Sequence, residues 1–170
     1  SFSLALDLLE SDTARSVMLS YNGVQNLGWD THAGSFLQAL HFNELFKELL
    51  SAMDELSGRQ GSGGGRLSDE VTVVLMSEMG RFPQENARGG KEHWTYTSAL
   101  LIGSGVQGGQ TIGGYDSYCF GQKVNLATGS VSDNGVSLLP GHFGATLLHL
   151  ADIESSEFVT GAEPIWAAIQ

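Results

Sequence analysis

The sequence predicts an α/β domain in which helices pack on a largely parallel sheet. Two apolar segments, residues 71–76 and 98–102, are long enough to form buried strands. Apolar residues recur at spacings of three and four across residues 42–56, which predicts a long amphipathic helix. Parallel neighbours need crossover connections, and this helix is the clearest one in the chain. We therefore expect residues 71–76 to form an inner strand that is buried on both faces.

The whole chain is expected to form one domain over residues 1–170. Its hydrophobic content of 41% and charged content of 16% are ordinary for a globular protein that buries a core. Glycine and serine at residues 58–66 predict a flexible loop, which we place inside the domain because the following strand needs the preceding helix to cover it.

Other elements follow from local patterns. Apolar spacing predicts a short helix at residues 4–9 and another at 142–150, after a proline and a glycine. Residues 16–21 form a plausible strand, which ends at the turn dipeptide Asn22-Gly23. The segment 115–139 is rich in turn residues and predicts irregular structure.

Composition excludes several classes of protein. A formal net charge of −11 argues against a nucleic-acid surface, which needs clustered lysine and arginine. No run of 18 apolar residues occurs, so no membrane span is expected. The first residues lack the basic start and cleavage pattern of a signal peptide. Cys119 is the single cysteine, so no internal disulfide can form.

A glycine-rich motif at residues 103–108 matches G-x-G-x-x-G. The dinucleotide fingerprint also requires a helix that opens at the third glycine and an acidic residue about 20 positions later. More glycines follow here, and the acidic position is empty. We therefore predict that this motif binds no nucleotide.

Polar residues follow the predicted strand at residues 71–76. Glu78 and Arg81 come directly after it, and His93 follows a glycine-rich loop. Side chains just past the carboxyl ends of parallel strands usually face the ligand crevice. These three side chains would then share one crevice edge. The alternative is a surface Glu–Arg pair with an unrelated loop histidine, and the pattern alone leaves both interpretations open.

Asp30 and His32 form a second candidate. In an extended segment, side chains two positions apart point to the same side, so one carboxylate and one imidazole can reach a common cation. Many such pairs are only hydrogen-bonded turn residues, which remains the alternative.

Several motifs together resemble a known family. GWDTH at residues 28–32, VTVVLMSEMGR at 71–81, GGKEHW at 89–94 and ALLIGSGVQGGQTIGGYD at 99–116 resemble the C-terminal part of the domain-of-unknown-function 1501 family. That family is similar to the sulfatases and alkaline phosphatases. The resemblance implies an alkaline phosphatase-like sheet, of which this chain would be an incomplete C-terminal portion. It also implies export to a bacterial periplasm.

The resemblance further implies a divalent metal, with zinc, manganese or iron possible. Asp30, His32 and His93 would hold one cation, and Glu78 would serve a second. Met79 stands where the phosphatases have a histidine, which leaves the second site incomplete. Because the upstream ligands are missing, the metal is expected to be weakly bound or absent. Arg81 is the candidate substrate-binding residue, and its alternative role is a salt bridge to Glu78 or Glu85.

We therefore expect a metal-dependent hydrolase-like domain of the sulfatase or alkaline phosphatase type. The complete protein would hydrolyse small sulfate or phosphate esters, and this chain would lack the upstream nucleophile. The alternative is a non-catalytic structural or binding module that keeps the phosphatase-like fold. An incomplete sheet would also leave an exposed edge, through which a homodimer could form.

Overall fold

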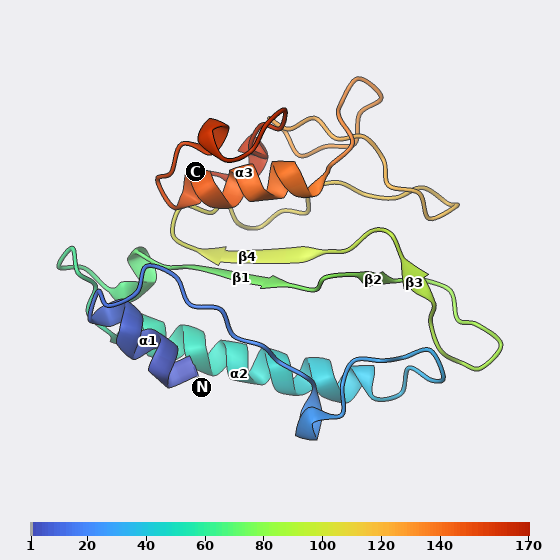
Figure 1. The fold of residues 1–170 in the computed structure, drawn as a ribbon, viewed down its shortest axis with the longest axis horizontal. Helices are drawn as coiled ribbons and strands as arrows, with labels where there is room; N and C mark the ends of the chain where they lie inside the picture. Colours follow the sequence, from blue (N-terminus) through green and yellow to red (C-terminus); the bar gives the residue numbers. More distant parts are fainter. Residues whose placement is uncertain (1) are drawn as a thin grey trace. The chain divides into compact units, whose positions relative to one another are not determined.

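A computed structural model describes residues 2–170 of the chain, and they group into two compact units. The first unit comprises the described residues up to Val71 together with Ser77–Thr97, and the second comprises Thr72–Met76 and Ser98–Gln170. Figure 1 shows the helices and strands of both units. Each unit is described by itself below.

The first unit is built on the long helix α2 (Gln38–Gly58). Its buried face carries His41, Leu45, Leu49, Ala52 and Leu56. The short helix α1 (Phe2–Glu10) lies alongside α2 and buries Ala5 and Leu6 (Figure 1). The predicted helices at residues 42–56 and 4–9 are thus confirmed. The 3-10 turns η1 (Val24–Asn26) and η2 (Leu67–Asp69) also pack against α2.

Arg59 links the ends of these two helices. Its guanidinium forms ion pairs with Asp7 at 2.7 Å, Glu10 at 2.8 Å and Glu55 at 2.5 Å. The Arg59 side chain is only 15% exposed, so solvent screens these pairs less than it screens ordinary surface pairs. One cation therefore holds α1 against the C-terminal end of α2.

The glycine-rich loop after α2 folds around a carboxylate. Glu70 accepts hydrogen bonds from the backbone N–H groups of Gly63 at 2.8 Å and Ser62 at 3.0 Å. The Gly63 N–H, followed by the hydroxyl and N–H of Ser62, holds the pKa of Glu70 below its usual value. The flexibility that we expect for residues 58–66 stays a prediction.

The second unit contains one antiparallel strand pair and a helix. Strand β1 (Thr72–Met76) pairs with β4 (Ala99–Gly103), with Thr72 opposite Gly103 and Met76 opposite Ala99. Helix α3 (Pro140–Leu150) confirms the predicted helix at residues 142–150. Residues 104–139, all of which the structure describes, form no helix. The glycine motif therefore lacks the helix N-terminus of a dinucleotide site, and the expected lack of nucleotide binding stays a prediction.

Hydrogen bonds join α3 to the C-terminal segment, which includes η3 (Ser155–Glu157) and η4 (Trp166–Ala168). The buried hydroxyl of Thr146 accepts the N–H of Ile165 at 2.9 Å, and the Nδ1 atom of His142 lies 2.9 Å from the carbonyl oxygen of Glu163. These contacts give His142 a structural role in the fold.

The predicted largely parallel, alkaline phosphatase-like sheet is wrong. The two sheets found in residues 2–170 are two-stranded and antiparallel, namely β1 with β4 and β2 (Gly80–Arg81) with β3 (His93–Trp94). Residues 16–21 form no strand, so α2 has no preceding strand from which to cross over. Residues 77–98, which connect β1 to β4, contain no helix. Parallel pairing needs a crossover connection, so without one the two strands pair antiparallel. Strand β1 is consequently an edge strand of intermediate burial.

None of the helices in residues 2–170 combines the length and the hydrophobicity that a membrane crossing needs.

Two leucines of α2, one buried and one exposed, test the packing of the first unit. Leu56 is 1% exposed and Leu50 is 64% exposed. We expect Leu56→Ala to lower the free energy of unfolding by about 2–5 kcal/mol, because it removes buried methyl groups and leaves a cavity. Leu50→Ala should change it by no more than about 0.5 kcal/mol. Urea denaturation of both variants measures this difference, and equal losses would contradict the assigned faces.

Candidate functional site

The short antiparallel pair of β2 and β3 places two of the candidate residues, Arg81 and His93, side by side. In the β2–β3 pair, Arg81 stands directly opposite His93, and Gly80 stands opposite Trp94. Residues directly opposite each other on neighbouring strands present their side chains to the same face. The backbone N–H of Phe82 donates to Glu92 O at 2.9 Å and extends the ladder by one bond. Arg81 and His93 therefore share a face, although no parallel sheet gathers them.

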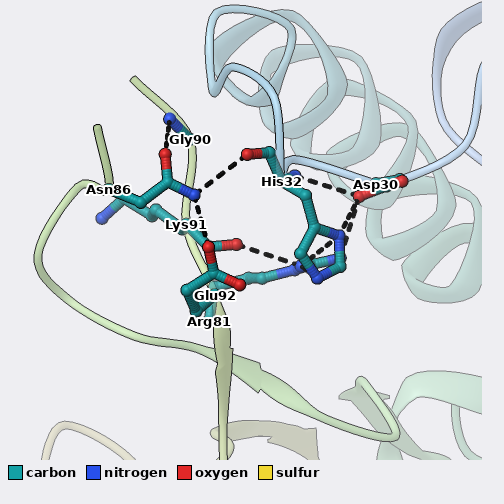
Figure 2. A network of polar contacts seen from close by, with 7 residues as sticks. All are labelled: Asp30, His32, Arg81, Asn86, Gly90, Lys91 and Glu92. Atoms are coloured by element: carbon teal, nitrogen blue, oxygen red, sulfur yellow. Dashed lines mark hydrogen bonds and ion pairs between the residues drawn. The ribbon is translucent and has the colours of Figure 1, made fainter. Parts of the chain in front are cut away.

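The Asp30–His32 segment lies against the loop that leads into β3. The N–H of Lys91 donates to Thr31 O at 2.8 Å, and the side-chain amide of Asn86 donates to His32 O at 3.0 Å. Gly90 lies so close to this segment that an added Cβ would stand 2.3 Å from Thr31 O. Figure 2 shows the bond from Asn86 to His32, with Asp30 and His32 beside Arg81.

Helix α2 anchors the other side of the same segment through His41. The Nδ1 atom of this buried imidazole accepts the N–H of Val24 at 2.9 Å, and its ring centre lies 4.8 Å from that of Trp29. Trp29 in turn donates its indole N–H to Tyr21 O at 3.1 Å. His41 thus positions the loop that carries Asp30, and it takes no part in the cluster itself.

Asp30, His32, Arg81 and His93 form what we call the Arg81 cluster. The ring centres of His32 and His93 are 4.7 Å apart, and Asp30 Oδ1 lies 2.5 Å from His32 Nδ1. Arg81 Nη1 lies 3.2 Å from both ring nitrogens of His32. Equal distances place Nη1 over the face of the ring and not along the lone pair of either nitrogen. One guanidinium nitrogen of Arg81 therefore contacts both nitrogens of the His32 ring.

The charges within the cluster are partly paired. Arg81 Nη2 lies 3.6 Å from Asp30 Oδ1, and Arg81 Nη1 donates to Lys91 O at 3.1 Å. The backbone N–H of His32, followed by its imidazole, holds the pKa of Asp30 below its usual value. Asp30 is 77% exposed whereas the Arg81 side chain is 19% exposed, so the carboxylate faces water and the guanidinium is largely covered.

The structure thus brings together four of the five residues predicted from the sequence. The exception is Glu78, which is exposed and accepts a hydrogen bond from its neighbour Ser77 at 3.3 Å. Arg81 forms its ion pair with Asp30, instead of with Glu78 or Glu85 as the alternative interpretation had it. Glu85 accepts a hydrogen bond from Ser35.

As these side chains stand, they do not fit a metal ion. Within residues 2–170, no three histidine, cysteine or acidic side chains are grouped so that they could hold one. Asp30 Oδ1 and His32 Nδ1 are bonded to each other, and the positive guanidinium of Arg81 contacts both ring nitrogens of His32. The set Asp30, His32, Glu78 and His93 stays a prediction as a metal site.

Sequence reasoning missed Asn86, which organises the loop between β2 and β3. Its Oδ1 atom accepts the N–H groups of Arg88 at 2.9 Å and Gly90 at 3.0 Å. Its Nδ2 atom donates to Glu92 Oε1 at 2.6 Å as well as to the carbonyl oxygen of His32 (Figure 2). An asparagine shortly before a Gly-Gly pair is a turn signal, and it could have indicated this role.

Comparison with known proteins gives one match. The model of a family described as "Protein of unknown function (DUF1501)" matches residues 4–165. No curated protein and no solved structure matches the chain. The site must therefore be interpreted from its own geometry.

The close approach of Gly90 offers a test of how the cluster is assembled. A Cβ at this position would lie 2.3 Å from Thr31 O and 2.4 Å from His32 O. We expect Gly90→Ala to cost about 1–3 kcal/mol and to move the His32 segment away from Arg81. NMR resonances of the His32 and His93 rings should shift as a result.

Gly108→Ala is the matched control, because a Cβ there meets nothing within 4 Å. It should leave stability and both ring resonances unchanged. Unchanged resonances in Gly90→Ala would show that the cluster does not depend on this contact.

Proposed function

Because the chain belongs to the DUF1501 family of proteins of unknown function, we propose its function from the geometry of the site: the Arg81 cluster binds the sulfate or phosphate group of a small ester. The convergence of one guanidinium and two imidazoles, Arg81 with His32 and His93, carries this proposal. Guanidinium and imidazole N–H groups are the donors that proteins present to tetrahedral oxyanions.

The hydrogen-bonding state of Arg81 supports anion binding. Its Nε–H has no acceptor among residues 2–170, and Nη2 has only the 3.6 Å ion pair with Asp30. These N–H groups are free to meet the oxygens of a ligand. Because the side chain is only 19% exposed, a contact there gains more than it would in open water.

The hydroxyl groups that stand close to the candidate residues in the sequence favour binding over catalysis. Thr31 Oγ1 is buried and has no hydrogen-bond partner within residues 2–170. Ser77 Oγ donates to Met79 O at 2.9 Å. Neither hydroxyl is bonded to an imidazole that could remove its proton, as an activated nucleophile requires. A binding module is therefore the first proposed function.

Hydrolysis of the same ester by a longer protein is the second candidate. The observation that favours it is the Asp30–His32 pair, because a carboxylate on Nδ1 orients an imidazole for general acid–base work at Nε2. The sulfatase or alkaline phosphatase type of reaction is taken from the motif resemblance. Assays with an aryl sulfate and an aryl phosphate should show turnover by a version extended at the N-terminus and none by this chain. Turnover by this chain would overturn the binding-only interpretation.

Arg81→Gln tests the proposed binding. We expect isothermal titration with phenyl sulfate and phenyl phosphate to show a ten- to hundredfold loss of affinity, as is typical when a hydrogen bond to a charged group is removed. Arg66→Gln is the control, because Arg66 is 67% exposed and pairs with Asp69 in the same unit. If Arg81→Gln and Arg66→Gln bind alike, the anion does not lie at the cluster.

The β1–β4 sheet supports the predicted dimer as a separate proposal. A two-stranded sheet leaves one edge of each strand unpaired, and such edges pair readily with another chain. We expect sedimentation velocity to show a dimer whose fraction rises with protein concentration. The fraction should also rise with salt, because salt screens the repulsion between two chains of net charge −11. A monomer under all these conditions would contradict the proposal.

A further inference from the structure

The second unit contains a cavity of about 600 Å³ beside the C-terminal part of α3. Ile153, Val159 and Pro164 give it apolar walls, and the rings of His149 and Trp166 also line it. This volume lies within the range of small-molecule sites, which is about 300–1,000 Å³. All of the lining residues belong to the second unit, so the cavity shares no residue with the Arg81 cluster.

Helix α3 holds one wall of the cavity in place. His142, Thr146 and His149 are four and three positions apart, so they lie on the same side of the helix. The first two are buried and form the 2.9 Å bonds to the C-terminal segment, which lies beside α3 (Figure 1). The ring of His149 meets that of Trp166, with centres 5.3 Å apart. Because the wall is already fixed, a ligand does not have to order it on binding.

Two carboxylates give the cavity a negative charge. Glu154 and Glu163 both line it, whereas no lysine or arginine does. Glu154 Oε1 accepts the N–H of Ser156 at 3.1 Å, which fixes this carboxylate at the start of η3. Among residues 2–170, Glu163 forms its hydrogen bond through the backbone carbonyl group and leaves the carboxylate without a partner. Such a cavity attracts a positively charged ligand.

The second unit as a whole carries charge of the same sign. Its only lysine or arginine is Lys123, which does not line the cavity. Against it stand six acidic residues, namely Asp116, Asp133, Asp152, Glu154, Glu157 and Glu163. A cationic ligand therefore meets no lysine or arginine at the cavity that would compete for its carboxylates.

Trp166 offers an aromatic surface for the ligand. Its side chain is 43% exposed, although it lies in the 3-10 turn η4 near the end of the chain. The contact with His149 is T-shaped, at 82°, and occupies at most one face of the indole. Indole is the aromatic ring that attracts ammonium groups most strongly. The cavity thus combines an aromatic ring, carboxylates and aliphatic walls.

We propose that this cavity binds a small organic ammonium compound, whose charged nitrogen contacts the carboxylates and Trp166. The apolar body of the compound packs against Ile153 and Val159. A metal ion suits the cavity less well, because no three histidine, cysteine or acidic side chains in residues 2–170 are grouped to hold one. The proposal does not rest on anion binding at the Arg81 cluster, since it concerns a ligand of opposite charge and other residues.

NMR titration with 2-phenylethylammonium tests the proposal, followed through the backbone amide resonances of residues 153–163. At pH 8 the amine carries its charge, whereas a histidine side chain is ordinarily neutral. We expect saturable shifts of these resonances. The alcohol 2-phenylethanol, which has the same apolar body without the charge, should bind at least about threefold more weakly. The anion 3-phenylpropionate should cause no shift.

Matched variants locate the ligand. Glu163→Gln and Trp166→Leu should each weaken binding about two- to fivefold, as expected for partly exposed ion pairs and cation–π contacts. Glu157→Gln and Phe158→Leu are the controls, because both residues are exposed and neither lines the cavity. If circular dichroism shows that Trp166→Leu does not fold, Glu163→Gln decides the test. Equal affinity for the amine and the alcohol would overturn the proposal, as would equal losses in Glu163→Gln and Glu157→Gln or an absence of saturable shifts.

Discussion

The candidate site depends on one backbone contact, the approach of the loop before β3 to the segment that carries Asp30 and His32. Arg81 and His93 belong to one hairpin, whereas Asp30 and His32 belong to a loop held by α2. The Lys91 N–H bond to Thr31 O, at 2.8 Å, the Asn86 amide and the fit of Gly90 against two carbonyl groups join their backbones. The Ser35 hydroxyl adds bonds to Glu85 and Gly89. Without this contact, the chain would carry an arginine–histidine hairpin and a separate aspartate–histidine turn. Neither part alone offers a convergent set of donors.

The charge of the whole chain and the charge of the cluster favour different ions. A net charge of −11 repels anions over long distances, but at physiological salt this repulsion is screened beyond about 8 Å. Arg81 acts at contact distance and is only 19% exposed, so its own field dominates at the site. The net charge of the chain therefore affects the association rate of an anion, and the guanidinium affects its affinity. This separation allows an acidic protein to hold an anion at one point.

Local patterns in the sequence predicted the helices and most of the site, and they failed for the sheet. Helix periodicity is a property of consecutive residues, so α2 and α3 could be found from spacing alone. The direction of a strand depends on its partner, and an apolar run such as 72–76 looks the same in parallel and antiparallel sheets. Residues 16–21 had the composition of a strand but no partner to pair with, and Met18 is 95% exposed. Asn86 was missed because its role consists of bonds to three residues of its own loop and to His32, which is distant in the sequence.

The cluster formed although the predicted sheet was wrong, and the register of the β2–β3 pair explains why. The crevice expected at the ends of parallel strands would have gathered Arg81 and His93 at one edge. The hairpin brings Arg81 and His93 together in another way, because they stand directly opposite each other on β2 and β3. Because side chains alternate along a strand, a slip of one residue would turn one of the two to the other face. Two features resist such a slip: the Phe82–Glu92 bond at 2.9 Å and the lack of room at Gly80, where a Cβ would collide with Tyr96 O. The chemistry that we propose is therefore set by the register of a very short ladder and does not require a large sheet.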